Sequence, residues 1–325
     1  MNGTNFDIES IIQALDNFDN FIIAGHQEPD GDCLCSQLAL AGYLKRRGKN
    51  TKLVSAGPFN RPEIKNWERF FSHTITDEDL QGKTLAVVTD CSSPDRTGSL
   101  SEKLSRIPLM VIDHHSSGDN FGEYRYIDSD SPSTTLLIQH IIETSGFDLT
   151  PEEAEYIFLG FCTDTGFFRH IGYGKPDVFQ AVSRLVAAGV SPNATHRIIT
   201  GGRTHGSRRL LGRILDRSRL YYNDRLIVSW EELKDRTELD TLDRDSDSLY
   251  HMLQSIGGVE AVAVLQEEEE NLFSIGLRSN DKTDVGLIAK NFGGGGHQKA
   301  AGCTLNGCRE DVMKAVVSAF EKSFS

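Results

Sequence analysis

Short apolar runs alternate with helical patterns through the first half of the chain. Runs typical of strands cover residues 21–25, 52–56, 84–89 and 109–112. Helices are predicted over 32–47, over 133–144 and from 150 onward, where Thr150, Pro151 and Glu153 form a capping box. Such alternation is typical of a parallel α/β sheet. We therefore predict an α/β domain over residues 1–190, with a mostly parallel sheet and helices on both faces.

The pattern changes after residue 190. Between 191 and 219, seven arginines accompany a single acid, and leucines and isoleucines lie at helical spacing. This predicts a solvated helical linker, with one or two arginines available to an anionic substrate. Strands over 226–230, 259–266 and 272–278 and a helix near 246–256 predict a smaller α+β domain over 220–325. Glu267 to Glu270 predict an exposed hairpin turn. We expect the active-site cleft between the two domains.

Composition and charge narrow the class of protein. With 325 residues, 38% of them hydrophobic and 25% charged, the chain can form two domains with separate cores. A net charge of −13 argues against a long duplex nucleic acid as partner, because such binding needs a broad basic surface. No apolar run approaches the roughly 20 residues of a membrane span. The N-terminus lacks the pattern of a signal peptide. We expect a cytoplasmic protein with no membrane partner.

The six cysteines show no disulfide framework, which fits a reducing compartment. Cys33 and Cys35 lie inside a predicted helix, at a spacing that does not suit a zinc site. We predict that both are buried as small apolar side chains.

Carboxylates and imidazoles gather at the ends of the predicted elements. They are Asp113, His114 and His115 after residues 109–112, His26, Asp30 and Asp32 after 21–25, Asp90 after 84–89, and Asp164 near the end of the helix that begins at 150. Because the carboxyl ends of parallel strands line the ligand crevice of an open sheet, we expect these side chains to converge. A surface turn without function is the alternative for residues 113–115 taken alone.

This set of side chains has the chemistry of a metal site. Five carboxylates packed together repel one another unless a cation lies between them. Oxygen and imidazole ligands without a matching set of thiolates suit Mn²⁺ or Mg²⁺. Two such ions about 3.5–4 Å apart can activate a water and stabilise the attacking and leaving oxygens in phosphoryl hydrolysis.

Two segments of the second half could bind an anion. Four consecutive glycines precede His297, and the backbone N–H groups of such a run can approach an anion closely. Arg278 and Ser279, at the end of a predicted strand, add a guanidinium suited to phosphate. The structural alternatives are a flexible glycine loop, a strand-end salt bridge for Arg278 and a loop-bracing hydrogen bond for His297.

Together these motifs resemble the DHH phosphoesterase family, in the branch whose C-terminal domain carries a GGGHxxAAG motif. The residues that carry the resemblance are His26, Asp30 and Asp32, then Asp90, Asp113, His114, His115 and Asp164, and finally Gly294 to His297 with Ala300, Ala301 and Gly302. They span nearly the whole chain in the family's order. One departure is Cys35, where the family commonly has a glycine before the serine.

The resemblance implies a cofactor and a role for each residue. It implies two Mn²⁺ ions, with Mg²⁺ or Co²⁺ as alternatives. One ion would be held by His26, Asp30, Asp90 and Asp164, and the other by Asp32, Asp90, His114 and Asp164, with Asp90 as the bridge. Asp113 would orient a histidine, and His115 would face the scissile phosphate. Arg278, Ser279, Gly294, Gly295, Gly296 and His297 would bind the substrate.

Within the family, the chain resembles the stand-alone nanoRNase and pAp phosphatase branch. It is too short for the added oligonucleotide-binding domain of the longer exonucleases, and it has the glycine-histidine motif that the pyrophosphatase branch lacks. The resemblance implies hydrolysis of very short RNA or DNA oligonucleotides and removal of the 3′-phosphate from 3′-phosphoadenosine 5′-phosphate (pAp). One alternative is a soluble phosphodiesterase for pApA or c-di-AMP, and another is a nucleotide-binding regulator that does not turn over. Members of this family often pair, so the resemblance is compatible with a homodimer.

Overall fold

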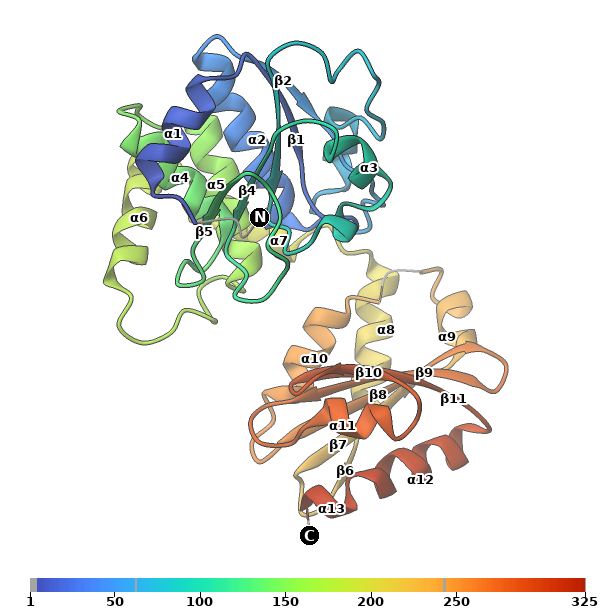
Figure 1. Cartoon of the computed structure of the whole chain (residues 1–325). Coiled ribbons are helices and arrows are strands. Elements are labelled where there is room, and N and C mark those ends of the chain that lie inside the picture. Colours follow the sequence, from blue (N-terminus) through green and yellow to red (C-terminus); the bar gives the residue numbers. More distant parts are fainter. Residues whose placement is uncertain (1–4, 62, 242–243, 325) are drawn as a thin grey trace. The chain divides into compact units, whose positions relative to one another are not determined.

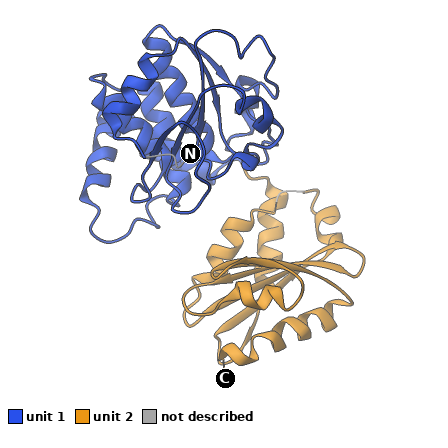
Figure 2. Cartoon of the chain, viewed as in Figure 1, with its two compact units in different colours: residues 1–202 blue, residues 203–325 orange. Residues whose placement is uncertain are grey.

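The protein forms two compact units. The computed structural model describes residues 5–61, 63–241 and 244–324, and these divide into unit 1, residues 1–202, and unit 2, residues 203–325 (Figure 2). The segment 191–219, predicted as one linker, is divided between them. Its helix α7 (Pro192–Thr200) falls in unit 1 and its helix α8 (His205–Asp216) in unit 2. Among the described residues, no helix has the length and apolar character needed to cross a membrane.

Unit 1 is built on a parallel sheet, as predicted, and this sheet has five strands. In spatial order the strands are β2 (Asn50–Leu53), β1 (Asn20–Ala24), β3 (Thr84–Thr89), β4 (Leu109–Asp113) and β5 (Tyr124–Ile127). Each ladder between neighbours is parallel. The central strands β3 and β4 match their predicted ranges to within one residue, whereas the edge strand β5 was not predicted from the sequence.

Helices cover the two faces of this sheet unequally (Figure 1). One face carries α1 (Ile8–Asp16), α2 (Gly31–Arg46), α4 (Thr134–Thr144), α5 (Pro151–Asp164) and α6 (Pro176–Ala187). The other face is covered by 3₁₀ helix η2 (Pro94–Leu100) and the short α3 (Ser101–Leu104), and a further 3₁₀ helix, η1, spans Lys65–Phe70. Phe21 and Ile23 of β1 pack into the first core, while Ile22 and Ala24 pack into the second. This period of two is expected for a strand buried on both faces.

The strand order places a topological switch point between β1 and β3. The chain leaves β1 for α2 on one face and leaves β3 for η2 and α3 on the other. In open sheets of this kind, ligands bind beside that point, at the carboxyl ends of the strands. The candidate acids and histidines follow these ends.

Unit 2 contains a six-stranded mixed sheet. In spatial order the strands are β10 (Gly295–His297), β11 (Ala300–Asn306), β9 (Leu272–Ser279), β8 (Ala261–Glu269), β7 (Leu226–Glu231) and β6 (Arg219–Tyr221). The β7–β8 ladder is parallel and the others are antiparallel. Strands β6, β10 and β11 were not predicted.

Two layers of helices enclose this sheet (Figure 1). On one face lie α8, α9 (Leu233–Glu238) and α10 (Ser246–Gln254), and on the other lie α11 (Val285–Lys290) and α12 (Arg309–Ala319), followed by α13 (Glu321–Phe324). The smaller α+β domain expected from the sequence is confirmed.

The structure shortens the turn predicted at residues 267–270, because only Glu270 of this run lies in the turn, together with Asn271. Glu267 to Glu269 continue strand β8 to its end, with an irregularity in the ladder between Glu267 and Glu269. The carboxylate of Glu268 accepts two hydrogen bonds from Arg244, at 2.8 and 3.0 Å. Pairing with arginine offsets the repulsion among neighbouring glutamates and allows them to stay in a strand.

Two arginines of this segment, Arg213 and Arg217, are ion-paired with a buried acid, whereas the sequence predicted a solvated helix. Arg213 donates to Asp235 over 2.7 Å, and Arg217 donates to both oxygens of the same carboxylate. Asp235 is fully buried in α9. A buried carboxylate needs such partners to offset its loss of hydration, so these arginines hold α8 against α9.

This network predicts a loss of stability in acid. Burial alone would raise the pKa of Asp235, but hydrogen bonds from Arg217 and Arg213 outweigh burial and lower it to about 2. Because this folded-state pKa lies below the unfolded value near 4, the stabilisation is complete above about pH 5 and is lost as the pH falls from 4 toward 2. Urea unfolding at pH 7 and at pH 3 should show a smaller difference between wild type and Asp235→Asn at the lower pH. A difference that does not change with pH would contradict the assignment.

Candidate functional site

The predicted ligands lie at the carboxyl edge of the unit 1 sheet. His26 follows β1, Asp90 follows β3, and Asp113 is the last residue of β4, with His114 and His115 after it. Helix α2 brings Asp30 as its N-cap and Asp32 in its first turn, and α5 ends on Asp164. All eight residues therefore belong to unit 1.

One group of ligands surrounds His26. Its Nε2 lies 3.8 Å from Oδ1 of Asp30 and 3.6 Å from Oδ2 of Asp90. The Nδ1 atom lies 2.8 Å from the carbonyl oxygen of Gln27, which fixes the ring so that Nε2 faces the acids. The sulfur of Cys33 also lies near His26 and Asp90, and the ligand atoms of these three side chains are within 4.8 Å of one another. The predicted burial of Cys33 is observed, but its closeness to His26 was not predicted.

A second group surrounds His114. Its Nε2 lies 3.4 Å from Oδ2 of Asp164, 3.5 Å from Oδ1 of Asp90 and 4.0 Å from Oδ2 of Asp32. The two oxygens of Asp90 therefore face different histidines, with Oδ2 toward His26 and Oδ1 toward His114. The structure therefore places His26, Asp30 and Asp90 in one group and Asp32, Asp90, His114 and Asp164 in the other. Asp90 is common to the two groups, whereas Asp164, which was predicted for both sets, lies beside His114.

Asp113 and His115 form a hydrogen-bonded pair beside these groups. Oδ1 of Asp113 lies 2.7 Å from Nδ1 of His115 and also accepts the backbone N–H groups of His114 and His115. This hydrogen bond raises the pKa of His115. Burial by itself would raise the pKa of Asp113, but the bond from His115 outweighs burial and lowers it. The pairing favours a protonated His115, in which Nε2 is the second N–H donor of the ring.

Thr134 and Thr135, which the sequence analysis missed, hold Asp32 in place. The backbone N–H groups of both threonines donate to the Asp32 carboxylate, over 2.7 and 3.0 Å, and the Thr135 hydroxyl adds a bond of 2.8 Å. The Thr134 hydroxyl donates to Asp90 over 3.1 Å. These threonines open α4 after its N-cap Ser133. The run of hydroxyl residues at the predicted helix start was the available signal.

Close packing of α2 on α5 allows these acids to approach one another. A Cβ on Gly31 would lie 2.4 Å from the Thr163 hydroxyl oxygen, and one on Gly160 would lie 3.1 Å from Cα of Asp32. Glycine at both positions therefore permits the contact between the helix that carries Asp32 and the helix that ends on Asp164.

The pKa values of the acids show how unfavourable the cluster is without a cation. Burial, together with the carboxylates of Asp90, Asp164 and Asp30, raises the pKa of Asp32 well above its usual range. Burial and the charges of Asp90 and Asp30 raise the pKa of Asp164 to about 6, although His114 opposes this. A divalent cation between these groups would relieve both effects, so the donor set fits a metal ion.

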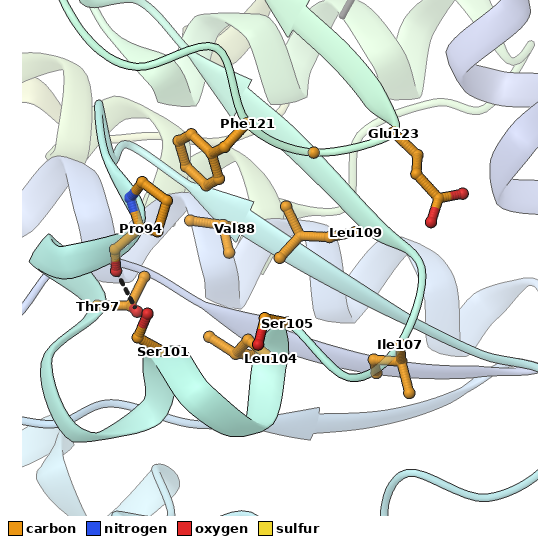
Figure 3. Close-up of a pocket in the computed structure, with 11 residues that line it drawn as sticks. Val88, Pro94, Thr97, Ser101, Leu104, Ser105, Ile107, Leu109, Phe121 and Glu123 are labelled. Atoms are coloured by element: carbon orange, nitrogen blue, oxygen red, sulfur yellow. Dashed lines mark hydrogen bonds between the residues drawn. The ribbon is translucent and has the colours of Figure 1, made fainter. Parts of the chain in front are cut away.

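A separate hollow lies on the face of the unit 1 sheet that η2 and α3 cover. Its volume is about 250 Å³, and Figure 3 shows Val88, Leu104, Leu109 and Phe121 around it. Glu123 is its one charged lining residue among the described part of the chain, and none of the predicted ligands lines it. Its apolar lining does not suit a metal or a phosphate, so it lies outside the candidate site.

Arg278 and His297 lie in one cross-strand row of unit 2. Arg278 of β9 pairs with Ala300 of β11, which in turn pairs with His297 of β10. Directly opposed residues point to the same face of an antiparallel sheet, so both side chains stand on one face with the small Ala300 between them. Ser279, also predicted to bind substrate, is the next residue of β9 and is buried on the other face. The structure therefore separates Ser279 from Arg278.

The glycines of this run mainly cap α11 and allow β10 and β11 to pack closely. Gly293 and Gly294 donate their N–H groups to the carbonyls of Lys290 and Ala289 at the end of α11. A Cβ on Gly294 would lie 2.2 Å from the Gly302 oxygen, and one on Gly296 would lie 2.5 Å from the Ala300 oxygen. These glycines let β10 approach β11, which sets the position of His297.

Comparisons with known proteins agree with this architecture. Residues 20–161 match the model of the DHH family N-terminal domain, and residues 224–325 match the model of the DHHA1 domain. The chain contains a DHH domain and a DHHA1 domain. This finding confirms the resemblance seen in the sequence and, with it, the expectation of an enzyme of this family.

Individual relatives align with most of the length of this chain. The bifunctional oligoribonuclease and PAP phosphatase NrnA of Thermus thermophilus is 29% identical over 301 residues, which cover 90% of this chain and 88% of that protein. An exopolyphosphatase-related protein from Bacteroides fragilis has the same fold, with a TM-score of 0.82, 23% identity, and coverage of 98% and 96% of the two chains. The exonuclease RecJ bound to manganese shares the fold more distantly, with a TM-score of 0.56, 14% identity and coverage of 99% and 95%.

Proposed function

We propose that this protein is a metal-dependent phosphoesterase that hydrolyses very short RNA oligonucleotides and removes the 3′-phosphate from pAp. The observation that carries the proposal is the Asp90 carboxylate, whose two oxygens face His26 on one side and His114 on the other. Such a carboxylate is suited to bridge two cations. The similarity to the Thermus thermophilus oligoribonuclease and PAP phosphatase supports this choice of substrates.

Two Mn²⁺ ions would occupy the two ligand groups. His26, Asp30 and Asp90 would hold one ion, and Asp32, Asp90, His114 and Asp164 the other. Bound cations of this kind activate water near neutral pH and neutralise charge on phosphate oxygens. Thr134 and Thr135 fix the orientation of Asp32 through their N–H groups and so set the geometry before a substrate binds.

His115 would act on the substrate directly. Asp113 holds its Nδ1 and raises the pKa of the imidazole, so that in its protonated form Nε2 would donate a hydrogen bond to the scissile phosphate or a proton to the leaving oxygen. The side chain is 37% exposed, whereas that of Asp113 is buried, which fits a donor that meets a substrate and a partner that orients it.

Arg278 and His297 would bind a second anionic group of the substrate. Most arginines of unit 2 pair with carboxylates, but among the described residues no carboxylate pairs with Arg278. Its guanidinium makes one hydrogen bond, from Nη1 to the Leu277 carbonyl oxygen, and keeps its other donors for a ligand. An unpaired guanidinium is well suited to phosphate.

We expect Arg278→Ala to lower kcat/KM on pAp and on an RNA dimer by roughly thirtyfold or more, because a desolvated charge pair with phosphate contributes about 2–5 kcal/mol. Steady-state kinetics with Mn²⁺ would measure the change. Arg219→Ala is a matched control, since Arg219 also stacks on an aromatic ring of unit 2 but lies at the far strand β6. Equal kinetics for the two variants would remove Arg278 from the binding site.

The proposed function is tested by a time course with purified protein and Mn²⁺. End-labelled RNA dimers, 5-mers and 24-mers would be run beside pAp and c-di-AMP, with a chelator-treated sample as control. Rapid loss of dimers and pAp with the 24-mer spared is the expected result. Preference for c-di-AMP would favour a dinucleotide phosphodiesterase, and rapid loss of the 24-mer a longer-range exonuclease. If no substrate were hydrolysed with any of Mn²⁺, Mg²⁺ and Co²⁺, a binding regulator would replace this proposal.

A further inference from the structure

Arg278 rests on the ring of a buried tyrosine. The guanidinium carbon lies 4.4 Å from the ring centroid of Tyr250, which belongs to α10 and is 6% exposed. A planar guanidinium can stack on an aromatic face while its N–H groups point outward in the guanidinium plane. At this distance the ring can hold the cation without using the N–H donors that a phosphate needs.

Gly276 provides the space for this tyrosine. It lies two residues before Arg278 on β9, so both positions face the same side of the sheet. A Cβ at position 276 would lie 1.8 Å from the Tyr250 hydroxyl oxygen and 3.0 Å from the ring carbon that bears it. Any larger residue there would displace the ring and, with it, the surface on which the guanidinium lies.

We infer that Tyr250 is a positioning residue for Arg278, with Gly276 leaving the space that its ring requires. The inference rests on the proposed function, in which Arg278 binds a substrate phosphate. Tyr250 itself makes no contact with the substrate in this scheme. It acts by restricting the rotamers of a long flexible side chain, so that less conformational freedom is lost when the phosphate binds.

The inference predicts that the KM for pAp depends on the aromatic ring of Tyr250 and not on its hydroxyl group. Tyr250→Leu should raise the KM for pAp roughly threefold to thirtyfold, the range expected for a lost cation–π contact, while kcat changes less than about twofold. Tyr250→Phe should keep the wild-type KM. In the presence of Arg278→Ala, Tyr250→Leu should cause no further change, because the contact it supports is already gone.

Two controls separate positioning from general packing. Leu253→Ala removes a fully buried side chain from the same helix and the same core cluster, so it should lower Tm without raising KM. Gly276→Ala should raise KM as Tyr250→Leu does. Combining Gly276→Ala with Tyr250→Phe should recover part of the loss, because the nearest atom is then a ring carbon at 3.0 Å instead of an oxygen at 1.8 Å.

The outcomes distinguish this inference from the proposed function. Calorimetric binding of pAp to Asp90→Asn protein, with and without Tyr250→Leu, reports positioning independently of turnover. If Arg278→Ala weakened binding more than tenfold but Tyr250→Leu changed it less than twofold, the positioning role would be wrong and the function would stand. Additive losses in the Tyr250→Leu, Arg278→Ala double variant would assign Tyr250 a purely structural role. If Arg278→Ala had no effect on binding, the positioning role of Tyr250 would also be wrong. Hydrolysis by unit 1 would still be tested by the time course with RNA oligomers, pAp and c-di-AMP.

Discussion

Asp90→Asn should lower kcat/KM on pAp and on RNA dimers by at least about a thousandfold, since the shared ligand supports several kcal/mol of charge stabilisation. The carboxylate lies 3.6 Å from the Nε2 of His26 and 3.5 Å from that of His114, so one substitution weakens both ligand groups. Asparagine is the informative replacement, because Asp90 has φ of 54° and asparagine tolerates the left-handed region. The fold should therefore remain intact.

Kinetics and Mn²⁺ titration calorimetry would measure this effect. We expect both the number of bound ions and their affinity to fall in Asp90→Asn, with circular dichroism and Tm close to wild type. Asp148→Asn is the matched control, because Asp148 is an exposed acid of unit 1 between α4 and α5, away from the ligand groups. Activity within tenfold of wild type in Asp90→Asn would refute the role of Asp90 as the shared ligand.

Gly296→Ala is expected to destabilise the protein by about 2 to 4 kcal/mol, because it combines backbone strain with overpacking. Gly296 has φ of 140°, and a Cβ there would lie 2.5 Å from both the Ala300 oxygen and Cα of Ala301. These contacts are with backbone atoms, which cannot rotate away. Strand β10 must then separate from β11, and His297 must move with it.

The neighbouring glycine provides the control for this prediction. A Cβ on Gly295 would meet no atom within 4 Å, so Gly295→Ala should change the free energy of unfolding by less than about 1 kcal/mol. Urea unfolding of the two variants measures the difference, and kcat/KM on pAp shows whether displacement of His297 also weakens catalysis. Similar stabilities for the two variants would show that β10 is not held tightly against β11.

The sequence predicted the elements whose patterns are local and strong. Strand β3 was predicted at its observed bounds, because all six of its residues are apolar or threonine and it is buried on both faces. The capping box of α5 is present as predicted. Edge strand β5 has no comparable apolar run, and β10 consists of two glycines and a histidine, so neither produced a signal. Helix α1 was missed although Ile8, Ile11 and Leu15 have helical spacing.

The candidate ligands that follow strands were predictable because the topology brings the carboxyl ends of the strands together, whereas Asp30, Asp32 and Asp164 lie at helix ends. What could not be predicted depends on contacts between distant parts of the chain. The hydrogen bonds from Thr134 and Thr135 to Asp32 join residues about a hundred positions apart. Ser279 was placed with Arg278 because they are neighbours in sequence, but neighbouring residues of a strand face opposite sides of the sheet. The capping bonds of Gly293 and Gly294 required knowledge of where α11 ends.

The bonds that Asp32 accepts have a practical consequence for handling the protein. Its carboxylate is tied to the first N–H groups of α4, where the helix dipole also favours negative charge. Part of the charge that a cation would neutralise is therefore already balanced by the polypeptide. Unit 1 should survive dialysis against a chelator in its native form, and adding Mn²⁺ back should restore activity without a refolding step.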